Sequence, residues 1–424
     1  MNGPAVNSLP GPEDILRQEL PNGAVLLGRA NYNSPSVFIQ GHLPAGALFD
    51  PPERLGLADF TAAALLHGVQ QRDFHEIYDL LESAGASLSF VSGVHSVSFS
   101  GKALVEDLDL LLGLLFEALT GPVFPDEHVE RLRAQLLTAL AMRAQDTGEM
   151  ASLTFDQIVY RQHPYRLPED GYPETVQAIR RENLVEFHRR HYGPRGLHLA
   201  IVGGIDPRLA LEKAAAALDG WINPEQPASP ALPPLQPLLA SERQHVAIPG
   251  KFQTDLVIGA AGPLRRDPDY LAASLGNHIL GQFGMMGRIG EAVREQAGLA
   301  YYASSSLGGG MGPGPWDIAA GVDPENLERA IELILEEVRR FTQEPVSAME
   351  LADSQANYIG RLPLSLESNA GVASALLTLE RYQLGLDYYR RYAGLVRAVT
   401  AGQILETARR FLDPQRLAIV SAGP

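Results

Sequence analysis

The sequence of 424 residues contains no cysteine, which excludes disulfide bonds and thiolate metal sites. It also contains no run of about 18 apolar residues, the length that a membrane-spanning helix needs. The first 13 residues are polar and hold no apolar signal core. We therefore expect a cytoplasmic protein without a membrane partner.

Basic residues are in the minority, with 34 Lys and Arg against 50 Asp and Glu and a formal net charge of -16. Nucleic acids and anionic membranes bind basic surfaces, so neither is expected as a partner. The hydrophobic content of 45% is that of an ordinary globular protein. The chain is too long for a single core and suits two to four domains.

Prolines concentrate near the middle of the chain. Residues 222–240 contain Pro224, Pro227, Pro230, Pro233, Pro234 and Pro237, a composition typical of an extended, semi-rigid linker. We expect a flexible N-terminal segment over 1–13, an N-terminal α/β domain over 14–221, this linker over 222–240 and a C-terminal α/β domain over 241–424.

The second half of the chain repeats features of the first. A strand pattern ending in Ala-Ile-Val, a Glu-x-Leu helix start and a proline before a helix recur at offsets of 218, 219 and 220 residues; the pairs are Val202 and Val420, Glu106 and Glu325, and Pro125 and Pro345. Three matches in register predict a duplication. Strands and helices follow one another in blocks in each half. The predicted fold class is α+β, with antiparallel-rich sheets covered by helices.

Residues 54–67 are rich in alanine and leucine and predict a helix. Leu57, Phe60, Ala64 and Leu65 share one face, so the helix is expected to be buried. Its opening phrase Gly-Leu-Ala-x-Phe resembles the zinc helix of the pitrilysin/insulinase family of metallopeptidases, which includes the processing peptidases. The resemblance implies two similar halves that close face to face like a clam shell.

In that family the helix carries His-x-x-Glu-His, in which two His bind zinc and the Glu is the general base. The corresponding positions run from Asp59 to Ala63 and contain no His; the base position is Ala62. The family's third ligand, a Glu, would fall within 135–141, where there is no carboxylate. Asp59, Ala62 and Ala63 thus form a degenerate motif. We expect no metal cofactor in this chain, because a catalytic zinc needs three protein ligands.

A second stretch, residues 290–306, predicts a helix that ends near Gly298 and then a strand. Arg294 and, seven residues later, Tyr301 within Gly-Leu-Ala-Tyr resemble the Arg/Tyr pair of the family's C-terminal half. The resemblance implies that Tyr301 stabilises the oxyanion and that Arg294 holds the substrate backbone. Tyr302 is interpreted as structural.

The alternating pattern of residues 87–100 predicts an antiparallel hairpin. By resemblance, Ser89, Phe90 and Val91 belong to the edge strand that pairs with substrate, although without zinc this strand could be only structural. The glycine-rich residues 308–314 lack the Lys and the spacing of a phosphate loop, so we expect a flexible connection there.

Four histidines were considered as metal ligands. His188 and His191 are three apart at a predicted helix end, and no third ligand accompanies them, so a surface helix end is expected. His67 and His75 lie two helical turns apart, which is too far for one ion.

Some members of the family are heterodimers in which one subunit carries the zinc motif and the other the Arg/Tyr pair. The resemblance implies that this chain is of the second kind, inactive alone, with a homologous His-x-x-Glu-His subunit as partner and unfolded peptides as substrates. Zinc is expected in the partner. The alternative is a non-enzymatic scaffold, like respiratory-complex core subunits of this fold. An active peptidase with an unconventional metal site is disfavoured by the missing ligands.

Overall fold

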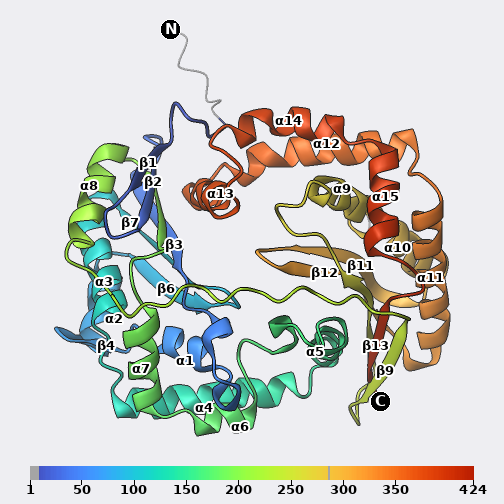
Figure 1. The fold of residues 1–424 in the computed structure, drawn as a ribbon, viewed down its shortest axis with the longest axis horizontal. Helices are drawn as coiled ribbons and strands as arrows, with labels where there is room; N and C mark the ends of the chain where they lie inside the picture. Colours follow the sequence, from blue (N-terminus) through green and yellow to red (C-terminus); the bar gives the residue numbers. More distant parts are fainter. Residues whose placement is uncertain (1–8, 285–286) are drawn as a thin grey trace. The chain divides into compact units, whose positions relative to one another are not determined.

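The computed structural model describes residues 9–284 and 287–424 (Figure 1). The predicted flexible segment 1–13 therefore lies mostly outside the described residues. The chain forms two compact units. Unit 1 comprises the described residues of Met1–Leu140, with Pro168–Ala231 and Leu362–Arg391, and unit 2 comprises Ala141–Leu167, the described residues of Leu232–Arg361, and Tyr392–Pro424. Within the described residues, no helix combines the length and apolar character needed to cross a membrane.

Unit 1 contains a six-stranded mixed sheet in the order β1-β2-β8-β3-β7-β6. Its strands are β1 Leu16–Glu19, β2 Val25–Ala30, β3 Ser36–Leu43, β6 Ser87–Ser92, β7 Val97–Leu104 and β8 His198–Gly203. Strands β2 and β8 are parallel, and the other neighbours are antiparallel. The turn between β1 and β2 holds Asn22 and Gly23, and Gly23 has the positive φ of 90° that favours glycine. Strand β6 forms one edge of the sheet.

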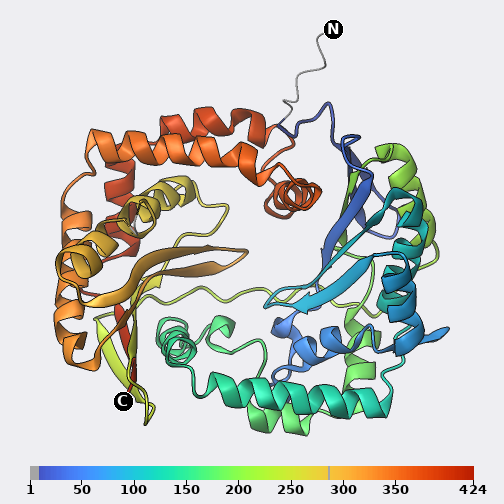
Figure 2. The same ribbon diagram turned by 180° about the vertical axis from the view of Figure 1, so that it is seen from behind.

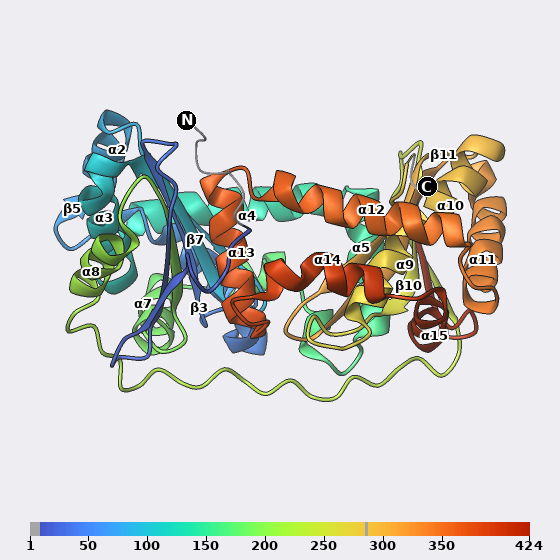
Figure 3. The same ribbon diagram turned by 90° about the horizontal axis from the view of Figure 1, so that it is seen from above.

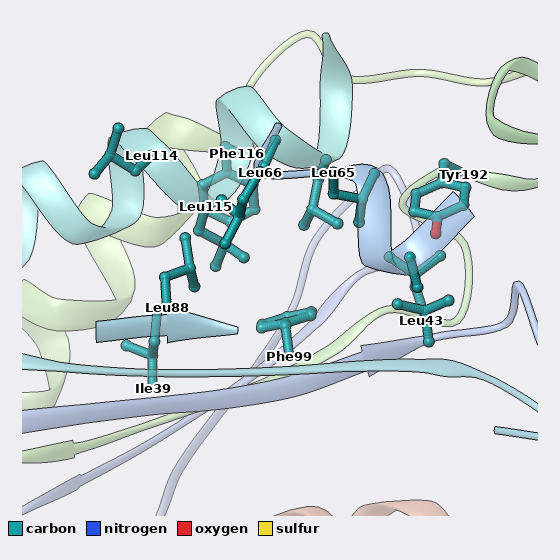
Figure 4. Packing of buried hydrophobic residues seen from close by; sticks show 14 of the residues in the cluster. Ile39, Leu43, Leu65, Leu66, Leu88, Phe99, Leu114, Leu115, Phe116 and Tyr192 are labelled. Carbon is teal, nitrogen blue, oxygen red and sulfur yellow. The ribbon is translucent and has the colours of Figure 1, made fainter. Parts of the chain in front are cut away.

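Helices cover one face of this sheet and form its core with it. They are α1 Leu57–Ala64, α2 Phe74–Ser83, α3 Leu108–Thr120, α4 Asp126–Arg143, α6 Pro173–Ala178, α7 Arg181–His191 and α8 Pro207–Ala217, with a small β4 (Gly68–Val69) and β5 (Arg72–Asp73) hairpin beside them. Figure 4 shows Ile39, Leu88 and Phe99 on the strands facing Leu65 and Leu115 on the helical side. The alternating apolar residues of the strands and the leucine-rich face of α3 thus produce one core.

Unit 2 contains a five-stranded mixed sheet in the order β11-β12-β10-β13-β9. Its strands are β9 Glu242–Ala247, β10 Thr254–Ala261, β11 Ala300–Gly309, β12 Pro313–Val322 and β13 Ala418–Gly423. Strand β13 runs parallel to β9 and antiparallel to β10, as β8 does to β2 and β3 in unit 1. The order β6-β7-β3-β8-β2 therefore recurs as β11-β12-β10-β13-β9, the pattern that a duplication produces. The fold class is α+β, as the sequence predicted.

The remaining helices are α9 Tyr270–Gly281, α10 Gly287–Gly290, α11 Leu327–Gln343, α12 Ala348–Ser365, α14 Tyr388–Ala398 and α15 Ala401–Phe411. Figure 2 shows α9, α11 and α15 from behind, on one side of the unit 2 sheet. Ile331, Ile334 and Val338 recur at helical spacing on α11 and are buried with Trp316 of β12 and Ile404 of α15. Residues 219–241, which include most of the predicted linker, hold neither helix nor strand.

Two helices pack on the sheet of the other sequence half. Helix α5 (Thr147–Val159) contributes Ala151 and Phe155 to a cluster with Val257 and Val420 of the unit 2 sheet. Helix α13 (Asn369–Tyr382) packs on β8 and β3 of unit 1, as Figure 3 also shows. In unit 1, Glu380 of α13 pairs with Arg17 of β1 at 2.8 Å. Each compact unit is therefore built from both halves of the sequence.

Candidate functional site

Arg294 lies in a π-helical segment, η5 (Glu291–Gln296), that continues α10. The helix ends where Gly298, at φ 66°, donates its N–H to the carbonyl of Arg294 at 3.1 Å and Leu299 donates to Val293 at 3.0 Å. π-Helical turns are rare and occur frequently at functional sites. The Arg294 side chain is partly exposed, and its ion pair with Glu295 at 3.7 Å leaves the guanidinium accessible.

Tyr301 occupies a bulge near the start of β11. Ala300 pairs with Val322 and Tyr302 pairs with Gly321, so two residues of β11 advance while β12 advances by one. A bulge of this kind re-aims a side chain and is common beside active sites. The Tyr301 side chain is 86% exposed. The backbone irregularity thus places a phenol in solvent at an edge strand.

The adjacent Tyr302 is tied into unit 2. Its phenol donates to Asp255 Oδ1 at 2.7 Å, and Gln253 Nε2 donates to the same oxygen at 2.9 Å. Thr147 on α5 donates to the other oxygen of Asp255. The Asp255 side chain is buried, so these three donors replace the water that the carboxylate loses. Burial is the main cause that raises the pKa of Tyr302, and its bond to Asp255 adds to the effect. Tyr302 is structural, as predicted.

Arg294 and Tyr301 line one open pocket of about 430 Å³. The other lining residues come from the loop before β10, the end of η5, β11 and the end of β12, and they are Phe252, Gln253, Gly298, Leu299, Ala300, Val322, Asp323 and Asn326. The structure therefore brings together the two residues that the sequence singled out. It adds Phe252, Gln253 and Asp255, which sequence reasoning missed because no motif or period marks the loop Gly-Lys-Phe-Gln.

The degenerate zinc positions lie on α1. Asp50 caps this helix and accepts the N–H groups of Gly56 at 2.8 Å and Ala58 at 2.9 Å. Ala62 is 2% exposed and belongs to the core, and Ala63 is partly buried. Burial raises the pKa of Asp59 to about 6, and the neighbouring Asp170 and Glu169 add to this shift. A methyl group therefore stands where a general base would be needed.

The segment 135–141 on α4 offers no replacement ligand. The Thr138 hydroxyl donates to the backbone carbonyl of Ala134 at 2.7 Å. Two turns of sequence earlier, Arg133 is buried with its guanidinium over the Phe60 ring of α1 at 5.4 Å. Among residues 9–284 and 287–424, no group of three or more His, Asp or Glu side chains is arranged to hold a metal ion. The residues present do not fit the family's zinc.

The predicted substrate strand is β6, at the edge of the unit 1 sheet. Ser89 and Val91 point to solvent, whereas Phe90 is partly buried with its ring 6.1 Å from that of Phe99. The glycine-rich residues 308–314 form the tip of the β11–β12 hairpin, where Gly309 pairs with Pro313. An open strand edge is present at β6, and its role in binding peptide stays a prediction.

The interpretation of His188 and His191 as a surface helix end is wrong. His188 Nε2 lies 2.9 Å from the carbonyl oxygen of Leu119, and burial lowers its pKa to about 4. His191 is buried between the rings of Phe49 and Phe187. The basic residues around them masked the apolar face of α7. His67 instead contacts His128 of α4, with 3.2 Å between the two Nδ1 atoms.

Comparisons with known proteins agree with this fold. A family model described as Insulinase (Peptidase family M16) matches residues 30–168, and one described as Peptidase M16 inactive domain matches residues 178–358. A protein of Streptomyces coelicolor named an uncharacterized zinc protease is 23% identical over 372 residues, covering 87% of this chain and 78% of that protein. Mouse cytochrome b-c1 complex subunit 1, mitochondrial, is 24% identical over 247 residues, which cover 57% of this chain and 50% of that one.

Among solved structures, a peptidase M16 inactive domain from Pseudomonas fluorescens is similar with a TM-score of 0.90 and 28% identity, covering 97% of this chain and 98% of that one. The two family matches span most of the sequence, one in each half. The chain therefore belongs to peptidase family M16, the insulinase family, and carries both of its domain types.

Proposed function

We propose that this chain is the zinc-less subunit of a two-subunit M16 peptidase and supplies Arg294 and Tyr301 to the zinc site of a homologous partner. The observation that carries the proposal is a contrast between two motifs. Arg294 and Tyr301 line one accessible pocket. The zinc positions Asp59, Ala62 and Ala63 offer a single carboxylate and two methyl groups. A chain that has lost its metal ligands but presents this pair needs a zinc site elsewhere.

The chemistry of the pair suits peptide-bond hydrolysis. When the scissile carbonyl is attacked, negative charge develops on its oxygen, and a fixed hydrogen-bond donor stabilises that charge. The exposed phenol of Tyr301 is such a donor. The guanidinium of Arg294 offers several N–H groups to the carbonyl oxygens of a substrate backbone. Zinc and the base that activates water would come from the partner's His-x-x-Glu-His motif.

The proposed substrates are unfolded peptides in an extended conformation. Strand β6, with Ser89, Phe90 and Val91, has an open edge to which an extended peptide could add as a further strand. Because hydrogen bonds to the backbone do not depend on sequence, this edge would bind peptides of varied sequence. In the assembled enzyme the edge and the Arg294 and Tyr301 pair would act on one substrate.

The test is to mix this chain with a His-x-x-Glu-His homologue from the same organism and to follow cleavage of quenched-fluorescent peptides. We expect little cleavage by either chain alone and turnover on mixing. Tyr301→Phe should lower kcat of the mixture by about 10²-fold and leave partner binding unchanged. Tyr32→Phe is the matched control, because Tyr32 is also exposed but lies outside the pocket. Unchanged turnover in the Tyr301 variant would contradict the role in trans.

A second candidate function is a non-enzymatic scaffold. The similarity to cytochrome b-c1 complex subunit 1 favours it, since that protein's name places it in a respiratory complex. A scaffold needs no phenol in solvent, so this reading gives Tyr301 no task. Stable association with a homologue, without turnover on any peptide, would favour the scaffold over the accessory subunit.

A further inference from the structure

Two aromatic side chains stand almost fully in solvent at the pocket of Arg294. Phe252 is 94% exposed and Tyr301 is 86% exposed, and both line the pocket. An aromatic ring in water leaves a large apolar area hydrated, which is unfavourable unless a ligand covers it. Two such rings on one pocket point to an apolar ligand group that neither ring binds alone.

The two rings are held by one buried carboxylate. Each precedes a residue that donates to Asp255 Oδ1: Gln253 follows Phe252 and donates at 2.9 Å, and Tyr302 follows Tyr301 and donates at 2.7 Å. The Asp255 side chain is 5% exposed and lies on β10 in the middle of the sheet. A loop and an edge strand are therefore tied to the same fixed atom, which presets the separation of the two rings.

Gly321 makes this arrangement possible. A Cβ atom at position 321 would lie 2.6 Å from Gln253 Nε2 and 2.6 Å from Cε1 of Tyr302. Contacts that short do not occur between non-bonded atoms, so any larger residue would separate the two anchors. The sequence of β12 thus leaves room for both donors to reach Asp255.

The charges around the pocket select a neutral ligand group. The Arg294 guanidinium disfavours a lysine or arginine side chain, and the exposed carboxylate of Asp323 disfavours an acidic one. Asp323 Oδ1 already accepts the N–H of Glu325 at 3.0 Å as the cap of η6 (Pro324–Asn326). Leu299, Ala300 and Val322 add apolar wall.

We propose that Phe252 and Tyr301 form an aromatic clamp for one large apolar side chain of an extended peptide, with aromatic side chains bound best. The peptide backbone would lie along β11, which is an edge strand of its sheet. Arg294 would then donate to a backbone carbonyl of the peptide. The clamp rests on the proposed function in that the peptide is the substrate. It makes Phe252 a residue that determines specificity and Asp255 a positioning residue.

Binding of labelled peptides to the purified chain alone tests the clamp. The probes are unfolded 12-residue peptides that are identical except for one central Phe, Leu, Ser, Asp or Lys, and fluorescence anisotropy gives each Kd. We expect the Phe peptide to bind about tenfold more tightly than the Ser peptide and the Asp and Lys peptides to bind more weakly than the Phe peptide. Phe252→Ala should remove this preference.

Leu239→Ala is the control, because Leu239 is 93% exposed, belongs to unit 2 and lies outside the pocket. Phe252 has almost no contacts to lose, so its variant should fold like the parent. Equal affinity for all five peptides, or a preference that survives Phe252→Ala, would overturn the clamp.

The cleavage assay with the zinc-bearing homologue separates this inference from the proposed function. A Phe252-dependent preference in binding, without turnover on mixing, would leave the clamp standing and contradict the accessory role. Turnover that needs Tyr301 but shows the same relative kcat/KM across the five peptides in the parent and in Phe252→Ala would do the reverse.

Discussion

Tyr302 donates its phenol O–H to the buried carboxylate of Asp255 at 2.7 Å, and this bond fixes the residue before it. Tyr301 occupies the bulge of β11 immediately ahead of Tyr302. The anchored ring of one tyrosine therefore sets the position of the exposed ring of the other. The two neighbours have separate tasks, because one stabilises the fold of unit 2 and the other is presented to solvent.

The two tyrosines should respond differently to loss of the hydroxyl. Tyr302→Phe leaves Asp255 one donor short, and we expect the free energy of unfolding to fall by about 1.5–3 kcal/mol. Tyr301→Phe removes a hydroxyl that is already in water, so its effect should stay within about 0.5 kcal/mol. Urea unfolding of both variants measures the difference. Equal stabilities would contradict the anchoring role of Tyr302.

Gly321→Ala should destabilise unit 2 without touching the pocket surface. The added methyl would meet Gln253 and Tyr302 at 2.6 Å, and relieving such overpacking typically costs about 1–3 kcal/mol. Gly360→Ala is the matched control, because a Cβ at position 360 of α12 meets nothing within 4 Å. That substitution should instead stabilise the helix by up to about 1 kcal/mol. Thermal unfolding of the two variants should therefore shift in opposite directions.

Much of the fold could be predicted from the sequence because local patterns encode it. The Asn22-Gly23 turn, the alternation in β6 and β7, and the leucine face of α3 all indicate their elements directly. The duplication was visible as matches in register, and the strand orders of the two sheets repeat in the same sense.

The exchange of α5 and α13 could not be predicted. The period of a helix shows that one face is buried but not which sheet buries it. The two helices have the ordinary apolar faces of Phe155 and Leu376, and these could have packed on either sheet.

The candidate site was predicted only in part. Arg294 and Tyr301 follow from the resemblance, whereas the π-helical turn and the bulge that present them depend on tertiary packing. Phe252 stands alone in a loop and has no period to mark it. Its importance appears only when its exposure and the shared anchor at Asp255 are seen together. His188 was misjudged because its basic neighbours suggested a surface.

The metal content of the purified chain should be low. The zinc positions hold Asp59, Ala62 and Ala63, and the described residues contain no other cluster of metal-ligating side chains. We expect far less than one zinc per chain by elemental analysis and no change in Tm with a chelator. The zinc-bearing homologue, purified in the same way, is the positive control. Stoichiometric zinc that is lost in Asp59→Asn would overturn this expectation.

His188 should make the parent lose stability in mild acid. Burial lowers its pKa in the folded state from the ordinary 6.5 to about 4, so the unfolded chain binds a proton that the folded chain does not. Stability is therefore lost as pH falls from 6.5 toward 4, by roughly 2 kcal/mol between pH 7 and pH 5. His188→Gln keeps a donor for the Leu119 carbonyl and removes the titration. Unfolding free energies at the two pH values should fall less in this variant, and equal slopes would contradict the shift.

Asp59 should act in the opposite direction. Burial, with Asp170 and Glu169 nearby, raises its folded pKa from the ordinary 3.8 to about 6, so the folded chain holds this proton more tightly than the unfolded chain. Ionised Asp59 then costs about 3 kcal/mol of stability above pH 6, and the cost fades as pH falls toward 4.

Asp59→Asn removes that ionisation, so we expect the variant to be more stable than the parent at pH 8 and nearly equal to it at pH 4. Urea unfolding at both pH values measures the two differences. Ala63→Ser, one turn along α1, is a control that adds a polar group without changing the titration. A parent that is more stable than Asp59→Asn at pH 8 would mean that a bound cation or an unrecognised donor holds the carboxylate ionised. The position of the lost zinc ligand would then still have a charge-dependent task.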